Sequence, residues 1–308
     1  MKNFDFGGNG QPLHFLHANG FPPDCYKPLF EILQTEYHVF GMLLRPLWGD
    51  AKMESITNWV PFSDDLRAFL ASSAPHNERA TPLSANPKPD PVIGVGHSVG
   101  AIATLRAAMR DPGLFHALIL LDPVLFVPKR LVEWKIQRAK NPTAHPLIQG
   151  AMRRRRTFAE LESVFSGYRD RDLFRYMSDA HLRIYIDGIT QPSSNGGFEL
   201  VFSPEWEARI YSTGLQDFDI WNNLENLRVP TLFIRGAETD TFLEDAANLV
   251  KQKQPKAKVE TLEQSTHLLP LERPQEVFDI IHSFVKSLES DSQESYSNDR
   301  PDFSNLIV

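Results

Sequence analysis

Short apolar runs alternate with amphipathic stretches along most of the chain. The apolar runs are residues 13–16, 39–44, 92–96, 117–121, 231–234 and 259–262. The first five are nearly continuous, as expected for strands of a parallel sheet that is covered on both faces. Amphipathic stretches lie between or after them at 26–33, 56–70, 99–109 and 274–288. This alternation predicts an α/β fold with a mostly parallel, doubly wound sheet.

Three segments interrupt the alternation. Residues 72–91 are rich in Pro, Ser, Ala and Asn, which is typical of an exposed loop. Residues 126–228 carry helical patterns without a clear series of strands, and they lie between two core strands, so we expect an inserted helical cap. Residues 289–308 are rich in Ser, Asp and Asn, and we expect a disordered tail. The predicted core therefore consists of residues 1–125 and 229–288.

The strongest local signal is the pentapeptide Gly-His-Ser-Val-Gly at residues 96–100. It follows an apolar run and opens a helix rich in small residues, which is the context of a nucleophile elbow. Bulky side chains at Gly96 and Gly100 would collide with the adjoining strand and helix. The tight turn lifts the Ser98 hydroxyl to the carboxyl edge of the sheet, where the helix N-terminus faces a developing oxyanion. We therefore predict that Ser98 is a nucleophile; the alternative is a plain strand–helix turn.

A serine nucleophile needs a base. His267 lies on the loop between the last predicted strand and the last predicted helix. From that loop an imidazole reaches back over the edge of the sheet, so we predict that His267 is the base. His97 belongs to the elbow itself, and we expect it to be structural.

The acid that orients the imidazole should lie between the serine and the histidine in chain order. Asp240 is our candidate, because it follows the run 231–235 after a short loop. The alternatives are Glu238, on the same loop, and Asp122, which ends the run 117–121. Pro123 fixes the chain that leaves that strand and favours a structural role for Asp122.

Residues 17–22, His-Ala-Asn-Gly-Phe-Pro, directly follow the first apolar core run. A turn at this place faces the elbow. One oxyanion donor is expected to be the backbone N–H of Val99, and the other should come from this loop. Gly20 allows the backbone to turn inward, and we predict that Phe21 N–H is the second donor. The alternative is a simple turn.

In this order the motifs resemble those of the α/β-hydrolase family, over roughly residues 10–288. Residues 268–274, Leu-Leu-Pro-Leu-Glu-Arg-Pro, also look like the run that follows the family's histidine. The resemblance implies a mostly parallel eight-stranded sheet with a cap after the sixth strand. It further implies a catalytic triad that works without a cofactor. It does not fix the substrate.

We expect the chain to cleave carboxylic esters of small to medium apolar acyl chains through an acyl-enzyme. A carbon–carbon bond hydrolase is an alternative, and it would need a carboxylate-binding arginine such as Arg153. Thioesterase and lactonase activities are compatible with the same triad. A ligand receptor built on this scaffold is a further alternative from another class, and repeated turnover would exclude it.

The net charge of −7 leaves no basic face for nucleic acid, so we expect no nucleic-acid partner. Cys25 is the one cysteine, which excludes an internal disulfide and a cysteine metal site. No segment approaches the roughly 20 apolar residues that span a bilayer, and the N-terminus has no signal-peptide core. We therefore expect a cytoplasmic protein with a small-molecule ester as its partner, no bound metal and no stable membrane insertion.

Overall fold

The computed structural model describes residues 1–73 and 90–298 of the chain. Its main sheet has seven strands, all parallel to their neighbours except β1, which is antiparallel to β3. In spatial order the strands are β1 (Asn3–Gly7), β3 (Tyr37–Met42), β2 (Gln11–Leu16), β4 (Val92–His97), β5 (Phe115–Leu121), β9 (Thr231–Gly236) and β10 (Lys258–Leu262). The mostly parallel α/β sheet is thus confirmed. It has one strand fewer than the resemblance implied, because β1 is the only strand before β2.

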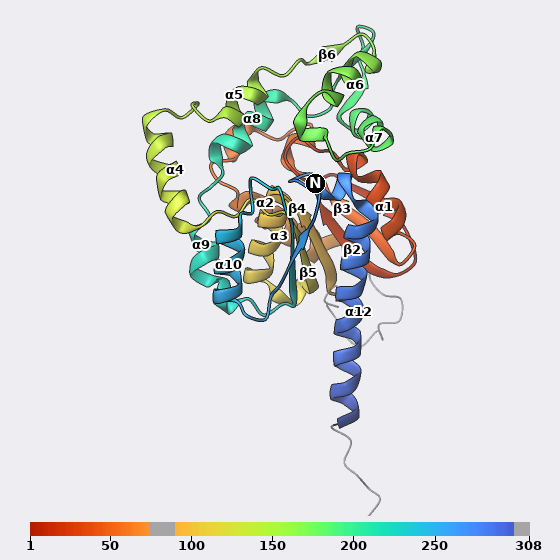
Figure 1. The fold of residues 1–308 in the computed structure, drawn as a ribbon, viewed down its shortest axis with the longest axis vertical. Helices are drawn as coiled ribbons and strands as arrows, with labels where there is room; N and C mark the ends of the chain where they lie inside the picture. The colour runs from red at the N-terminus through yellow and green to blue at the C-terminus, as the bar shows by residue number, and fades with distance from the viewer. Residues whose placement is uncertain (74–89, 299–308) are drawn as a thin grey trace, which may run out of the picture.

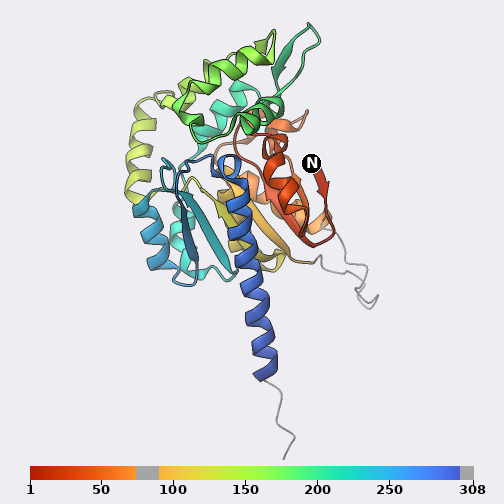
Figure 2. The same ribbon diagram turned by 45° about the vertical axis from the view of Figure 1, so that its right-hand side comes forward.

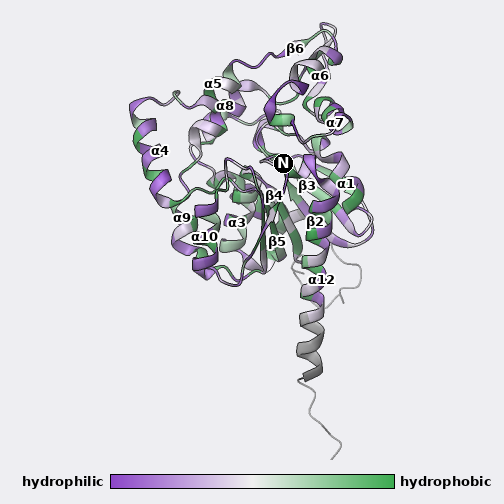
Figure 3. Ribbon diagram, viewed as in Figure 1, coloured by the Kyte–Doolittle hydropathy of each residue, from purple (hydrophilic) through white to green (hydrophobic). Residues whose placement is uncertain are grey.

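Helices cover the sheet on both faces (Figure 1). Alternate residues of β5 show why: Leu118 and Leu120 belong to one buried cluster, whereas Ile119 and Leu121 belong to the other. Side chains of a strand point to opposite faces in turn, so a strand buried on both sides must be apolar throughout. Figure 3 shows the central strands in mainly hydrophobic colours. The first cluster includes side chains of α2 (Val60–Ser73), α3 (Val99–Arg110) and α10 (Glu244–Lys253), and the second those of α1 (Lys27–Leu33) and α12 (Pro274–Asn298).

The chain between β5 and β9 adds no strand to the main sheet. It forms α4 (Pro128–Lys140), α5 (Pro146–Met152), α6 (Leu161–Arg169), α7 (Asp179–Ile189), α8 (Pro204–Thr213) and α9 (Phe218–Asn223). It also contains a small antiparallel sheet, β6 (Thr157–Phe158), β8 (Phe198–Leu200) and β7 (Thr190–Pro192), which the sequence analysis did not predict. Figures 1 and 2 show α5 to α8 together at one end of the main sheet.

A buried ion-pair cluster fastens the end of this insertion to the body. Arg106 of α3 is 3% exposed and contacts Asp217 and Asp219, each at 2.7 Å. Ionic groups are taken out of water only where they are paired, so these contacts fix the start of α9 against α3. The segment just before α9 is therefore held in place.

Shorter helices complete the described chain. They are α11 (Leu269–Glu272) and the 3₁₀ helices η1 (Pro23–Tyr26), η2 (Arg45–Leu47), η3 (Met53–Ser55), η4 (Pro112–Leu114), η5 (Asp172–Phe174) and η6 (Leu224–Asn226). No helix within residues 1–73 and 90–298 combines the length and the apolar character that crossing a membrane requires.

The predicted disordered tail is wrong over residues 289–298. Helix α12 continues to Asn298 and projects beyond the body of the molecule (Figures 1 and 2). A helix that is already formed adds further residues at little cost. Residues 299–308 of the predicted tail lie outside the described residues. So do residues 74–89 of the predicted loop, whereas 72 and 73 belong to α2.

Candidate active site

Ser98 stands at a sharp turn between β4 and α3. Its backbone has φ 60° and ψ −121°, in the left-handed region that non-glycine residues seldom adopt. A Cβ on Gly96 would lie 2.5 Å from the carbonyl oxygen of Gly100, and one on Gly100 would lie 2.2 Å from that of Leu16. Both positions therefore require glycine, for the steric reason expected from the sequence. The turn places the Ser98 side chain, 6% exposed, above the end of β4.

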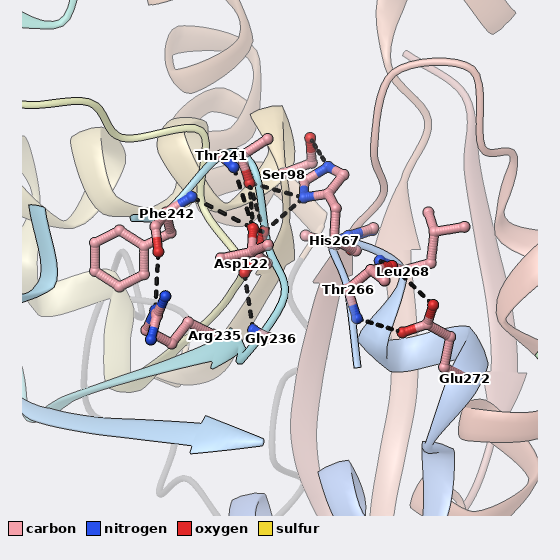
Figure 4. A network of polar contacts seen from close by, with 12 residues as sticks. Ser98, Asp122, Arg235, Gly236, Thr241, Phe242, Thr266, His267, Leu268 and Glu272 are labelled. Carbon is pink, nitrogen blue, oxygen red and sulfur yellow. Dashed lines mark hydrogen bonds and ion pairs between the residues drawn. The ribbon is translucent and has the colours of Figure 1, made fainter. Parts of the chain in front are cut away.

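The imidazole of His267 lies between a hydroxyl and a carboxylate (Figure 4). Its Nε2 is 3.0 Å from Ser98 Oγ, and its Nδ1 is 2.7 Å from Asp122 Oδ2. A carboxylate can only accept, so Nδ1–H donates to Asp122 and Nε2 is left to accept from the Ser98 hydroxyl. This arrangement can remove the Ser98 proton.

The buried side chain of Glu272 holds the loop that carries His267. The backbone N–H and the hydroxyl of Thr266 both donate to the Glu272 carboxylate at 2.7 Å (Figure 4). The N–H of Leu268 in turn donates to the Thr266 hydroxyl at 3.1 Å. Because the residues on both sides of His267 are held, its imidazole has little freedom to leave the Ser98 hydroxyl.

The carboxylate that contacts the imidazole is Asp122, at the end of β5. It is fully buried, and its backbone has φ 39°. Besides His267 it accepts from Gly236 N at 3.0 Å, from the Thr239 hydroxyl at 2.5 Å and from the Thr241 hydroxyl. These donors satisfy a buried charge that would otherwise be costly.

The expectation that Asp240 orients the imidazole is therefore corrected. Asp240 is exposed on the loop after β9, and no hydrogen bond joins it to His267. The strand order gives the reason, because β5 lies directly between β4 and β9. The end of β5 is thus beside Ser98. In the loop after β9, the hydroxyl of Thr241 contacts His267, whereas Asp240 is exposed. The Asp122 carboxylate contacts His267 even though Pro123 follows it in the chain.

Two opposing effects act on the pKa of His267. Burial lowers it, but the hydrogen bond and the charge of Asp122 raise it, with smaller contributions from Asp240 and Glu272. The net result is a pKa above the ordinary histidine value of 6.5.

His97 links the two loops that border Ser98. A carbonyl can only accept, so His97 Nε2–H donates to the His267 carbonyl oxygen at 2.8 Å, and His97 Nδ1 accepts from the Tyr26 hydroxyl at 2.8 Å. The Tyr26 oxygen accepts from Ala18 N–H at 3.1 Å. Burial lowers the pKa of His97 far below 6.5, so the ring is neutral and this assignment of protons holds.

The loop at residues 17–22 faces the elbow, but Phe21 N–H does not serve as expected. It donates to the Ala18 carbonyl oxygen at 3.3 Å and closes the turn. Within the described chain, the backbone N–H groups of Asn19 and Val99 have no hydrogen-bond partner. Both residues line the same cavity as Ser98. The loop therefore offers Asn19 in place of Phe21.

Ser98 and His267 open into a cavity of about 430 Å³ between the insertion and the edge of the sheet. A site of this size holds a small organic molecule. Apolar and aromatic side chains predominate on its wall, among them Trp59, Val124, Phe126, Trp134, Ile210 and Leu215.

Known proteins resemble the chain in sequence. The sequence pattern of the Alpha/beta hydrolase family matches residues 15–280. The type I acyl-CoA thioesterase mpaH' of Penicillium brevicompactum is 30% identical over 113 residues, which are 35% of this chain and 25% of the thioesterase. The chain thus spans only about a quarter of that relative. The (E)-2-((N-methylformamido)methylene)succinate hydrolase of Acinetobacter baylyi is 19% identical over 290 residues, 91% of this chain and 92% of that protein.

Solved structures resemble the fold over nearly the whole chain. E-2-(acetamidomethylene)succinate hydrolase has a TM-score of 0.70 at 17% identity and covers 92% of this chain and 94% of its own. The esterase Rv0045c of Mycobacterium tuberculosis has a TM-score of 0.67 at 17% identity, with 92% and 88% covered. These two likenesses concern the fold alone, whereas the family pattern spans the elbow and the histidine loop. The chain belongs to the alpha/beta hydrolase family.

Proposed function

We propose that this hydrolase cleaves carboxylic esters of small to medium apolar acyl chains through an acyl-enzyme on Ser98. The observation that carries the proposal is the hydrogen-bonded series Ser98–His267–Asp122, which opens into a mainly apolar cavity. A hydroxyl, a base and an orienting carboxylate in this order form a serine triad.

In the first half-reaction, Ser98 Oγ attacks the acyl carbon while His267 Nε2 takes the Ser98 proton. The bond between the acyl carbon and the alcohol oxygen then breaks, and His267 gives its proton to the leaving alcohol. In the second half, water attacks the acyl carbon of the acyl-enzyme and gives a proton to His267. The bond between the acyl carbon and Ser98 Oγ then breaks, the carboxylic acid leaves, and His267 returns the proton to Ser98 Oγ. Asp122 holds Nδ1–H throughout and stabilises the imidazolium.

The oxyanion of each tetrahedral intermediate needs hydrogen-bond donors that are already in position. Val99 N–H supplies one at the N-terminus of α3, where the helix dipole also favours negative charge. For the second donor we propose Asn19 N–H, because Phe21 N–H is engaged in the turn and Ala18 N–H is engaged by Tyr26.

The lining of the cavity favours an apolar acyl group over a dicarboxylate. Among the described residues that line it, none is lysine or arginine. Two proteins that match more than nine tenths of this chain are named for succinate derivatives, and such substrates would need a cation near the triad. Arg153 is exposed and does not line the cavity, while Arg154 is paired with Glu207 at 2.5 Å. The carbon–carbon alternative therefore lacks its expected carboxylate partner.

A thioester is the second candidate substrate, because the segment that is 30% identical belongs to acyl-CoA thioesterases. The same triad and cavity can accept an acyl group from sulfur as well as from oxygen. A lactone remains a cyclic ester within the main proposal.

A matched substrate series tests the proposal. Nitrophenyl esters from acetate to dodecanoate are compared with S-butyryl-N-acetylcysteamine, butyryl-CoA and a succinate monoester. We expect many turnovers per protein, highest with short to medium neutral esters. A preference for the thioesters would select the second candidate. One product per protein or none would contradict both candidates and favour a ligand receptor.

The acid limb of kcat/KM for a neutral ester should have its midpoint above pH 6.5. His267 must be neutral to accept the Ser98 proton, and its pKa is raised above that value by Asp122. The rate therefore falls as pH drops through the raised pKa and reaches a plateau on the alkaline side. Stopped-rate measurements from pH 4 to 9 check this, with circular dichroism to verify folding. A flat profile down to pH 4 in folded protein would rule out His267 as the base.

Replacing Tyr26 with phenylalanine should lower both stability and kcat. The change leaves Ala18 N–H and His97 Nδ1 without their buried partner, at a cost of about 1–3 kcal/mol for each such group. Because the same hydroxyl ties the 17–22 loop to His97, kcat should fall more than KM rises. Tyr37→Phe is the matched control, since its hydroxyl contacts His282 instead. Equal kinetics in the two variants would contradict the expected role of Tyr26.

A further inference from the structure

One residue at the cavity has a charge that the proposed mechanism does not use. Asp240 lines the cavity that holds Ser98 and His267, and its side chain is exposed. No hydrogen bond or ion pair engages its carboxylate within the described chain. Glu238, two residues earlier on the same loop, is instead paired with Arg175 at 2.5 Å.

The charges on the rest of the cavity wall leave Asp240 uncompensated. It is the one carboxylate among the described lining residues, and that lining has no lysine or arginine. The lining also includes two histidines: burial lowers the pKa of His145, and His267 is neutral in the active enzyme because it acts as the base. A cavity with low-dielectric walls and charge of one sign focuses that field on whatever enters. An anionic group near the scissile bond would therefore be repelled, and a cationic group attracted.

We propose that Asp240 determines specificity by charge: it selects against anionic substrates and favours esters whose alcohol carries a cation. This inference rests on the proposed ester hydrolysis and names the substrate class of the same site. Asp240 acts on substrate binding and takes no proton in the reaction.

The aromatic lining points to the same class of ligand. Trp59, Phe126, Trp134 and Tyr211 all line the cavity. Faces of aromatic rings attract cations, and aromatic rings together with one acidic group are suited to bind a quaternary ammonium group.

The charge of Asp240 also affects the pKa of other groups at the cavity. Burial and Glu207 raise the pKa of Tyr211, and Asp240 adds to that rise; Asp240 is likewise among the groups that raise the pKa of His267.

Three butyrate esters that differ in the charge of the alcohol test the proposal by kinetics, and the cationic and uncharged ones have nearly equal shape. They are butyrylcholine, its uncharged isostere 3,3-dimethylbutyl butyrate, and the anionic butyryl glycolate. For the unmodified enzyme we expect kcat/KM to fall in that order. Asp240→Asn should reduce the ratio of the cationic to the anionic ester by about tenfold, and added salt should reduce it only when Asp240 is present.

The matched control is Glu244→Gln. Glu244 is exposed at the start of α10, does not line the cavity, and its replacement changes the net charge by the same amount. In Glu244→Gln, the ratio of kcat/KM for the cationic ester to that for the anionic ester should stay within about twofold of the value for the unmodified enzyme. An unchanged ratio in Asp240→Asn, or equal changes in both variants, would overturn the inference.

Ligand binding separates this inference from the proposed function. Quenching of tryptophan fluorescence by phenyltrimethylammonium and by benzoate is measured on the full chain, without any turnover. We expect tighter binding of the cation, and loss of that preference in Asp240→Asn but not in Glu244→Gln. Absent ester turnover with this binding pattern would defeat the proposed function alone. Turnover of the uncharged ester without any charge preference would defeat this inference alone.

Discussion

Replacing Ser98 with alanine should abolish nearly all ester turnover and leave the fold intact. The change removes only the hydroxyl that is 3.0 Å from His267 Nε2, and it keeps a Cβ at a backbone position that already tolerates one. In a triad, loss of the nucleophile typically costs about 10⁶ in kcat, because the residual rate comes from the oxyanion donors and binding alone. Single-turnover kinetics and thermal melting measure the two effects.

Covalent labelling gives the same prediction a readout that does not depend on the substrate. A fluorophosphonate should modify Ser98 in the unmodified protein, and mass spectrometry should find no adduct in Ser98→Ala. Ser212→Ala is the control, since its hydroxyl donates to the Arg209 carbonyl within α8 and is not part of the site. An adduct on any other serine, or normal turnover in Ser98→Ala, would contradict the assignment of the nucleophile.

The parts of the fold that the sequence predicted are those with a strong local pattern. Runs such as 92–96 and 117–121 became β4 and β5 because a strand buried on both faces must be apolar at every position. The elbow was predictable for a similar reason, since Gly96 and Gly100 are each required by a close backbone approach. These signals belong to single segments, and the remainder of the chain does not alter them.

Short or partly exposed elements gave no such pattern. Strands β7 and β8 have three residues each, which is too short for an alternation of apolar and polar residues to be recognised. They are strands because they pair with each other. Helix α12 beyond residue 288 has few apolar residues and continues because the helix is already formed. In both cases the structure depends on neighbours that composition does not reveal.

The structure differs from the sequence prediction at two site residues, in one case because of tertiary contacts and in the other because of a local turn. Asp122 and Asp240 both follow core strands and both lie between Ser98 and His267 in chain order. Only the strand order, with β5 beside β4, decides between them. Likewise, the N–H of Phe21 lost its expected role to a turn with Ala18, which local sequence did not specify.

Asp122→Asn should therefore lower kcat by about 10⁴, whereas Asp240→Asn should cost far less with an uncharged ester. The factor for Asp122 follows the serine-protease template, in which the equivalent change favours the wrong imidazole tautomer. The contacts of this site give the reason. Gly236 N–H, which can only donate, bonds Asp122 Oδ1, whereas the Thr239 hydroxyl bonds Oδ2, the oxygen that also contacts His267. The oxygen of an asparagine is therefore expected to take the Oδ1 position, because the Thr239 hydroxyl can rotate to accept instead.

The amide NH₂ of that asparagine is then left to face His267 Nδ1. An N–H that donates to Nδ1 moves the ring proton to Nε2, where it faces Ser98 and cannot accept the hydroxyl proton. The variant also loses the main charge that raises the pKa of His267, so only the smaller contributions of Asp240 and Glu272 oppose burial, and the remaining acid limb should shift to lower pH. Both variants are compared by kcat, pH profile and circular dichroism. A purely structural role of Asp122 would lower stability in Asp122→Asn without moving the acid limb. Near-normal turnover in Asp122→Asn, together with an inactive Asp240→Asn, would return the role of acid to Asp240.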